Sequence, residues 1–270
     1  MRLLFRAFMI QAYEDCVSND IEPCSMLTLL VCGYCQKLKL STFFSQQPGD
    51  TLYLSPLVVN YFGVVECSSP KAHLHAHVYH KGKGKYRGNN VASLLLKTLK
   101  MKGLVNQNNP PGKNFASVFD NYLRQNKNGM VLKLVAWLVE MNYFQEAGFM
   151  FLIIGHTKNP VDPLFNLLKQ RYQSMNNLFT MEDLIECVNG NESISALQSE
   201  GNDFKDFMAY QKDFHKPFAT NTILKYQIFR NHKDGNKGVI RYYESDLLGA
   251  TRRDDPSCRC HVAKEVCASG

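Results

Sequence analysis

The chain has 270 residues, 45% of them hydrophobic, which is the length and composition of a globular protein with a substantial core. This excludes a disordered chain, and no apolar run approaches the ~20 residues of a membrane-spanning helix, so we expect no membrane partner. The net charge of +7 is moderately basic and permits contact with a nucleic acid. Nine scattered cysteines indicate reduced thiols in an intracellular protein, with the nucleus as one candidate compartment.

The first part of the chain predicts three strands. Residues 1–26 predict a helix and a connector. Strands are then predicted over 26–35, from 57 to 67, and over the strictly alternating segment 72–80. A basic, glycine-rich loop (81–90) leads to a helix over 91–101. This order predicts an antiparallel meander followed by a helix.

Residues 114–172 carry the pattern on which the rest of the interpretation depends. An apolar strand ends at Asp120, an amphipathic helix follows, and a buried strand over 149–154 comes next. Another helix begins near Asp162, an N-cap acid followed by a proline at the first helical position. Strand–helix–strand units of this length imply parallel strands.

Titratable side chains follow these parallel strands where they end. Because α/β sheets bind ligands at the carboxyl ends of their strands, Asp120, His156 and Asp162 are expected to converge at one edge. Two plainer interpretations stay open. An aspartate before a helix is commonly a cap, and a histidine after a strand commonly hydrogen-bonds a loop carbonyl.

The last third of the chain has a different character. A helix is predicted over 180–188 from a capping signal at Thr180 and Asp183. Beyond residue 190 we expect a helix over 203–214 and two strands over 223–229 and 239–243. These predict a small α+β appendage over 190–248, followed by a disordered tail over 249–270.

The segments FDNYLRQNKN and GHTKNPVDPLFNLLKQRY resemble a transposon-derived family of uncharacterised function, which looks like an RNase-H-like integrase/transposase (DDE/DDD-type) catalytic core. The family carries an Asp-Asn pair followed by a Gln-Asn-Lys-Asn run, and a Gly-His-Thr-Lys block that ends in an aspartate. The residues that match are Asp120, Asn121, Gln125 to Asn128, Gly155 to Lys158, and Asp162. The resemblance runs from about residue 27 to residue 189.

The resemblance implies an α/β fold with an RNase-H-like mixed sheet over 27–189, in which a three-strand meander is followed by parallel crossover strands and flanked by helices. It also implies a site for two Mg²⁺ or Mn²⁺ ions that catalyse phosphoryl transfer. Asp120 matches the second metal-binding acid and Asp162 the third, and His156 would orient a phosphate or a water. The first acid is replaced by Gly33. Glu66 is a weak candidate for a substitute.

A nucleic-acid-binding surface is a further expectation. Lysines interleaved with glycines suit a phosphate backbone, and polar side chains of the motif blocks suit contacts to it. The candidates are Lys81, Lys83, Lys85, Arg87, Asn121, Gln125, Asn126, Lys127 and Lys158. For the loop, the alternative is a solvated surface. For the polar turn after Asp120, the alternative is stabilisation of that turn.

Three histidines alternate along the third predicted strand, at His73, His75 and His77, so they share one face. Imidazole suits Zn²⁺, but no matching cluster of cysteines or carboxylates accompanies them. We therefore expect them to be exposed strand residues.

These observations leave three hypotheses of function. The first is a transposase-derived domain with impaired catalysis that binds DNA. The second is a protein-interaction domain that kept the fold and lost nucleic-acid binding. The third is an active divalent-metal nuclease that uses a substitute acid. The missing acid at Gly33 favours a protein that is not an enzyme.

Overall fold

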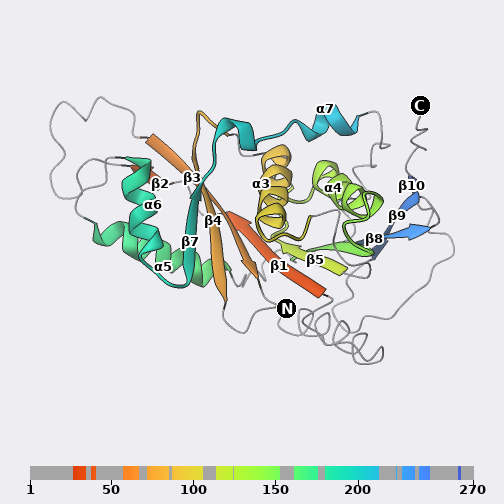
Figure 1. The fold of residues 1–270 in the computed structure, drawn as a ribbon, viewed down its shortest axis with the longest axis horizontal. Helices are drawn as coiled ribbons and strands as arrows, with labels where there is room; N and C mark the ends of the chain where they lie inside the picture. The colour runs from red at the N-terminus through yellow and green to blue at the C-terminus, as the bar shows by residue number, and fades with distance from the viewer. Residues whose placement is uncertain are drawn as a thin grey trace.

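The computed structural model describes residues 27–34, 38–40, 57–66, 72–84, 87–105, 114–123, 125–152, 161–175, 180–212, 223, 227–234, 237–243 and 261–262. The predicted helix in residues 1–26 lies outside them. The described chain has a mixed α/β fold built on one ten-stranded sheet (Figure 1). The strand order is β10-β9-β8-β6-β5-β1-β3-β4-β7, and β2 (Leu38–Leu40) pairs with β3 beside this path.

The predicted meander is present in the sheet, between β5 and the edge strand β7. It consists of β1 (Leu27–Tyr34), β3 (Leu57–Glu66) and β4 (His73–His80), and β3 pairs antiparallel with both of its neighbours. Seven consecutive residues of β3 are buried, because helices cover both of its faces.

The predicted crossover unit follows the meander. Helix α3 (Gly88–Met101) leads to β5 (Asn114–Phe119), and α4 (Gly129–Glu140) leads to β6 (Glu146–Phe151). Strand β5 runs parallel to β1, and β6 runs parallel to β5. The strand predicted over 149–154 therefore begins three residues earlier, because the pairing of Glu146 with Asn114 sets the start of the ladder.

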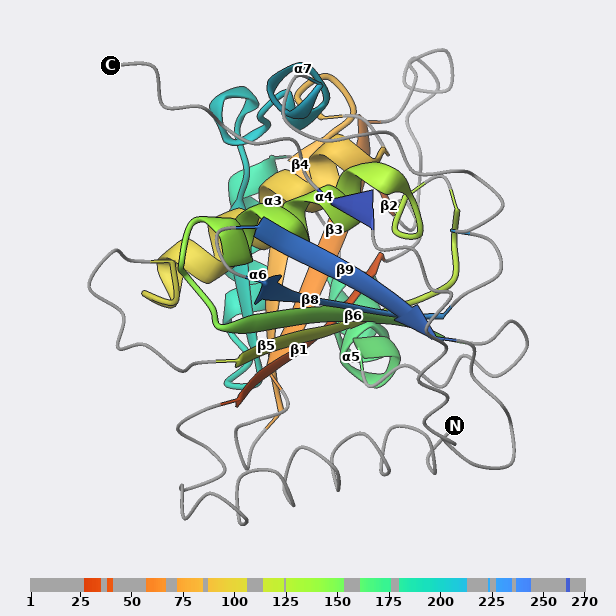
Figure 2. The ribbon, with the colours of Figure 1, turned by 90° about the vertical axis from the view of Figure 1, so that its right-hand side faces the viewer.

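Helices cover both faces of the sheet (Figure 2). Helices α3 and α4 lie on one face, and α5 (Val161–Ser174) lies on the other, with α6 (Met181–Asn189) packed against α5 and β7. Helix α6 begins with the predicted capping box, in which Asp183 N–H donates to Thr180 Oγ1 and Thr180 N–H donates to the Asp183 carboxylate.

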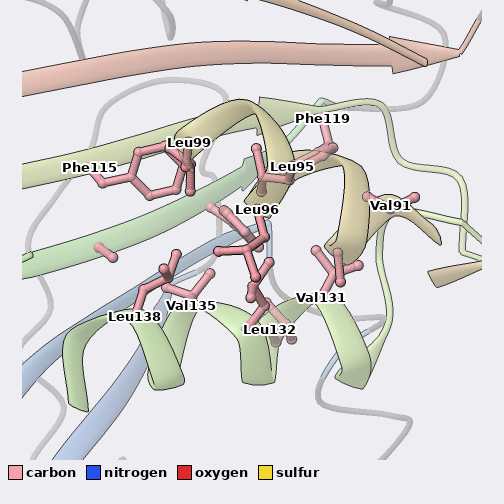
Figure 3. Close-up of a cluster of buried hydrophobic side chains, with 14 of the residues drawn as sticks. Val91, Leu95, Leu96, Leu99, Phe115, Phe119, Val131, Leu132, Val135 and Leu138 are labelled. Atoms are coloured by element: carbon pink, nitrogen blue, oxygen red, sulfur yellow. The ribbon is translucent and has the colours of Figure 1, made fainter. Parts of the chain in front are cut away.

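Two buried clusters hold these layers together. The first joins the sheet to α3 and α4, and Figure 3 shows leucines of α3 interleaved with valines and leucines of α4 beneath Phe115 and Phe119 of β5. The second joins the sheet to α5 and α6. Each fully buried leucine, valine or phenylalanine stabilises the fold by roughly 1.5–3 kcal/mol relative to an exposed one.

The C-terminal strands extend the same sheet at both edges. Strand β7 (Ile194–Gln198) lies parallel to β4, while β8 (Ile228–Asp234) and β9 (Lys237–Tyr243) form an antiparallel hairpin against β6. A short strand, β10 (His261–Val262), pairs with β9 inside the segment expected to be a tail.

The sequence interpretation of this region was wrong in three places. Strand β7 was not predicted, because its five residues follow α6 closely and alternate only briefly. The helix predicted over 203–214 is a 3₁₀ turn (Gly201–Asp203) and a short helix, α7 (Phe207–Gln211). The strand predicted over 223–229 is displaced to β8, where pairing with β6 and β9 determines its bounds.

Candidate functional site at the end of strand β5

The acid at the end of β5 is held by the turn that follows it. The carboxylate of Asp120 accepts a hydrogen bond from the side-chain amide of Asn126 and another from the backbone of Tyr122. Burial raises the pKa of the Asp120 carboxyl, and both hydrogen bonds oppose that shift. The turn therefore fixes an aspartate at the carboxyl end of a parallel strand.

Asn128 joins this turn to the start of α4. Its Oδ1 accepts hydrogen bonds from the backbone N–H groups of Met130 and Val131, at 3.0 and 3.1 Å. Its Nδ2 donates to the carbonyl oxygen of Gln125 at 2.8 Å. One side chain therefore caps the helix and closes the turn.

Three polar side chains of the turn are buried, with exposed fractions of 7% for Gln125, 0% for Asn126 and 2% for Lys127. The Lys127 ammonium lies 5.8 Å from the ring centroid of Phe151, a cation–π distance, and burial lowers the pKa of Lys127. The Asn126 side chain stabilises the turn through its hydrogen bond to Asp120. A direct contact of a nucleic acid with them, or with half-buried Asn121, stays a prediction.

Gly33 and Asp120 follow the paired residues of two neighbouring parallel strands. The parallel ladder of β1 and β5 pairs residues as far as Val31 with Val118, and Gly33 and Asp120 each come two residues later in the chain. On its other side, Gly33 pairs with Gly63 of β3. Continuation of this register would set Gly33, where the family resemblance implies an acid, next to Asp120.

An aromatic ring of α5 covers this part of the sheet. A Cβ atom at Gly63 would lie 2.6 Å from the ring of Phe165, so the ring rests directly on the glycine backbone. Helix α5 packs against both β1 and β3. Asp162 lies one turn before Phe165 in this helix.

Asp162 is exposed in the first turn of α5, one residue inside the helix rather than at its N-cap. A carboxylate is favourable there because the N-terminus of a helix carries partial positive charge. Asp162 and Asp120 both follow the carboxyl ends of neighbouring parallel strands, and the close approach of their carboxylates stays a prediction. His156 and Lys158 lie outside the described residues.

The described side chains at this edge do not fit a pair of Mg²⁺ or Mn²⁺ ions. Within the described ranges, no group of three or more His, Cys, Asp or Glu side chains is placed to hold a metal. A two-metal site needs carboxylates that bridge the ions. Gly33 contributes no side-chain oxygen, and the carboxylate of Asp120 is already engaged by Asn126.

Glu66 was a candidate for a substitute acid, and its position does not suit that role. It pairs with Leu30 of β1, three residues before Gly33, and forms an ion pair of 2.5 Å with Lys102 just after α3. Its carboxylate therefore lies on the α3 face, whereas the aromatic ring over the glycines belongs to α5 on the opposite face. The sheet itself separates Glu66 from the space between Gly33 and α5.

The basic loop lies between β4 and α3. Lys81 and Arg87 are exposed, whereas Lys83 forms an ion pair of 2.9 Å with Glu200. Lys85 lies outside the described residues. The loop thus offers two exposed cations and one that is already paired.

The end of the basic loop adjoins the Asp120 turn. Gly88, the first residue of α3, packs so closely against Asn128 that a Cβ atom there would lie 2.6 Å from its Nδ2. The N-termini of α3 and α4 therefore lie side by side. Arg87, just before α3, and exposed Tyr122, in the turn before α4, come from the two segments that meet there.

The sequence analysis predicted that the strand histidines are exposed, and this prediction was wrong for His77. His77 has no exposed surface, because its side chain faces α3. The Thr98 hydroxyl donates to the Leu94 carbonyl at 2.9 Å, so His77 Nε2 donates to Thr98 Oγ1 at 2.7 Å. His77 Nδ1 then accepts from the Ser199 hydroxyl at 3.3 Å. This neutral histidine is a structural link, and its pKa is lowered to about 3, chiefly by burial.

The other histidines of β4 are half-buried. His73 bonds the Ser195 hydroxyl at 2.7 Å, and its ring lies 4.8 Å from that of His75. Burial, followed by the charge of Lys102, lowers the pKa of His75 to about 4. Through these contacts, His73 joins β4 to β7 and His77 joins β4 to α3.

The sequence interpretation missed two acids that contact lysines of the basic loop and of α3. Glu200 caps the 3₁₀ turn after an unpredicted strand, and Asp203 ends that turn. Their carboxylates pair with Lys83 and Lys97, which are distant in sequence. Glu200 and Asp203 have the spacing of a capping box, in which each side chain accepts a hydrogen bond from the backbone of the other residue. This spacing was the one local signal in the sequence for the turn.

The fold and this edge of the sheet define a mixed α/β domain in which an aspartate, two helix N-termini and a basic loop adjoin one another. The chain belongs to the family described as Domain of unknown function (DUF7869), whose model matches residues 56–246. That span contains Asp120 and all strands from β3 to β9, and it begins after Gly33. No curated protein and no solved structure matches the chain. Among the described helices, none is both long and apolar enough to cross a membrane.

Proposed function

We propose that this chain is an RNase-H-like domain of transposase descent, with impaired catalysis, that binds nucleic acid. The sheet order β4-β3-β1-β5-β6 supports this proposal, because it combines an antiparallel meander with two parallel crossover strands. That order and those strand directions are what the resemblance of the two motif blocks implies.

The observation that carries the proposal is the register of β1 and β5, which sets Val31 opposite Val118. Gly33 and Asp120 each come two residues later, towards the carboxyl ends of these strands. The resemblance of the motif blocks implies acids on both strands at this place, to hold the two metals of phosphoryl transfer. Here one acid is present, fixed by Asn126, and its neighbour is glycine. We therefore infer that the fold was kept while the metal pair, and with it the chemistry, was lost.

Nucleic-acid binding is proposed from the same edge. Backbone N–H groups at the N-terminus of α3 favour phosphate oxygens, whereas the Met130 and Val131 N–H groups of α4 are already bonded to Asn128. Arg87 and Lys81 add exposed positive charge, and Tyr122, with half of its surface exposed, offers a ring on which a base can stack. These contacts carry no sequence code, so we propose weak, salt-dependent binding to the phosphate backbone.

We predict that the wild-type chain binds a labelled DNA duplex weakly and that neutralising Lys81, Lys83, Lys85 and Arg87 weakens binding further. Each phosphate that the variant no longer neutralises should reduce the slope of log K against log salt by roughly 0.9, because fewer counterions are released. Fluorescence anisotropy over a range of salt concentrations measures this slope. Arg87→Gln and Lys100→Gln, at opposite ends of α3, form a matched pair, and we expect only the first to change the slope.

An equal slope for the wild type and the four-residue variant would refute the basic loop as the binding surface. Absence of DNA binding at low salt would favour the second function, a protein-interaction domain. Cleavage of the duplex in Mn²⁺ that is abolished in Asp120→Asn would favour an active nuclease; we expect no cleavage.

A further inference from the structure

A segment after β7 lies along the outer side of α3, and we name residues 199–211 the acidic strap. Lys205 N–H donates to Ser93 Oγ at 2.9 Å. Asn89 Nδ2 donates to the Asp206 carboxylate at 3.0 Å, and Met208 N–H donates to Asn89 Oδ1 at 3.2 Å. The strap therefore follows α3 towards its N-terminus, where the basic loop ends.

Two further contacts fix the first half of the strap. Lys97 of α3 forms an ion pair of 2.7 Å with Asp203, and both side chains are partly buried. The ring of Phe204 packs edge-on against Tyr79, with 5.1 Å between centroids. A Cβ atom at Gly84 would lie 2.8 Å from the Phe204 ring, so the basic loop and the strap are in direct contact.

Glu200 is the residue through which the strap meets the charge of the loop. Its carboxylate accepts from Lys83 Nζ at 2.9 Å and from Gln198 Nε2 at 2.6 Å. The hydrogen bond from Lys83 lowers the pKa of Glu200, so the carboxylate is ionised near neutral pH. Both partners remain about half exposed, at 46% and 48%, so an anion from solvent can reach the lysine.

An exposed ion pair of this kind is weak and is screened by salt, so it is readily exchanged for another anion. The rest of the strap is held by contacts that do not involve Lys83. Exchange at Lys83 therefore requires no unfolding of the strap. The Glu200 carboxylate is thus placed to compete with incoming phosphates for Lys83 of the basic loop.

We propose that the acidic strap is an intramolecular competitor for polyanions, in which Glu200 occupies Lys83 in the free protein and a bound phosphate backbone displaces it. This inference rests on the proposed nucleic-acid function. It adds a mechanism that lowers affinity for any polyanion without changing the fold, and that weakens as salt screens the pair.

The test compares Glu200→Gln with the wild type. An exposed ion pair contributes less free energy than a tenfold change in affinity requires. Its removal should therefore tighten binding by about two- to fivefold at low salt, and by less at high salt, where the pair is screened. Two probes are used, a labelled DNA duplex and inorganic polyphosphate. Glu192→Gln is the matched control, because this exposed acid lies at the opposite end of β7 and loses the same charge. In a Lys83→Ala background the gain from Glu200→Gln should disappear.

Tighter binding of both probes by Glu200→Gln, but not by Glu192→Gln, supports the competitor and the proposed function together. A gain for polyphosphate while neither protein binds DNA supports the competitor and overturns the proposed function. An equal gain in Glu192→Gln, or no gain for either probe, overturns the competitor, because the effect is then one of net charge or does not exist.

Discussion

At the scale of single residues, a pair of glycines sets how closely α5 approaches the sheet. Gly63 has a buried aromatic ring where a side chain would begin, and Gly33 is its cross-strand partner. Directly paired residues of an antiparallel ladder present their side chains to the same face. Any side chain at Gly33 therefore enters the layer between the sheet and α5.

We predict that Gly33→Asp lowers the free energy of unfolding in the absence of metal and that Mn²⁺ or Mg²⁺ partly restores it. A buried carboxylate without a partner is costly, and Asp120 beside it adds repulsion. A cation that binds the folded state alone stabilises it by mass action. Thermal melts with and without Mn²⁺ measure the effect, and we expect little response from the wild type.

Gly33→Asn is the control for this prediction, since asparagine has the shape of aspartate without its charge. We expect it to destabilise through crowding near Phe165 and to show no response to metal. Equal metal-induced shifts in Gly33→Asp and the wild type would mean that Gly33 does not occupy the lost metal position.

At the scale of elements, α4 is the helix that presents the candidate site. Most of its surface is buried by α3, β6 and the β8–β9 hairpin, so its position is fixed by packing. Its N-terminus is fixed by Asn128, which also contacts the turn and the start of α3. Because α4 is fixed by packing and Asn128 bonds both α4 and the turn, the position of the Asp120 turn is fixed as well.

We predict that Asn128→Ala costs about 1–2 kcal/mol of unfolding free energy, at the upper end of the range for lost N-caps, because the turn and the cap fail together. Urea unfolding followed by circular dichroism measures the loss. Thr180→Ala, which removes the cap of α6, should cost about 1 kcal/mol and leave DNA binding unchanged. A cost for Asn128→Ala below that for Thr180→Ala would contradict the dual role of Asn128.

At the scale of the whole molecule, one hydrogen-bond network joins three parts of the fold. His77 of β4 bonds Thr98 of α3 and Ser199 at the start of the strap. Lys97 and Asp203 pair beside it, so the imidazole faces one cation and one anion. Protonation of His77 would place a charge in the core and disrupt a donor–acceptor pattern that requires the neutral ring.

Because the pKa of His77 falls from 6.5 to about 3 on folding, the unfolded chain binds more protons between these values. Its contribution to stability is complete above about pH 6.5 and is lost as the pH falls towards 3. We predict a loss of about 2 kcal/mol between pH 7.5 and pH 5 from His77, with a smaller addition from half-buried His75. Asp120 opposes this trend, because its pKa is raised.

Urea midpoints at the two pH values measure this loss. His77→Gln keeps a neutral hydrogen-bonding side chain without the titration, so it should be less stable at pH 7.5 and lose less on acidification. An equally steep decline in His77→Gln would assign the pH dependence to other groups.

The sequence by itself determined the elements whose signals are local. The alternation of β4, the capping box of α6 and the apolar runs before Asp120 and after Glu146 were sufficient to predict a meander followed by a parallel crossover. They also placed Asp120 at a strand end, and the family resemblance led to the hypothesis that Gly33 replaces an acid. These features depend on neighbouring residues in the chain, where side-chain periodicity and turn chemistry act directly.

Tertiary structure alone decided which distant residues meet. The pairing of Gly33 with Gly63, the burial of His77, and the contacts of Glu200 and Asp203 with lysines of the basic loop and α3 all join segments far apart in sequence. The C-terminal strands joined the central sheet because β4 and β6 offered unpaired edges. Such pairings depend on register and on which face of the sheet a helix covers, and neither is written in the local pattern of residues.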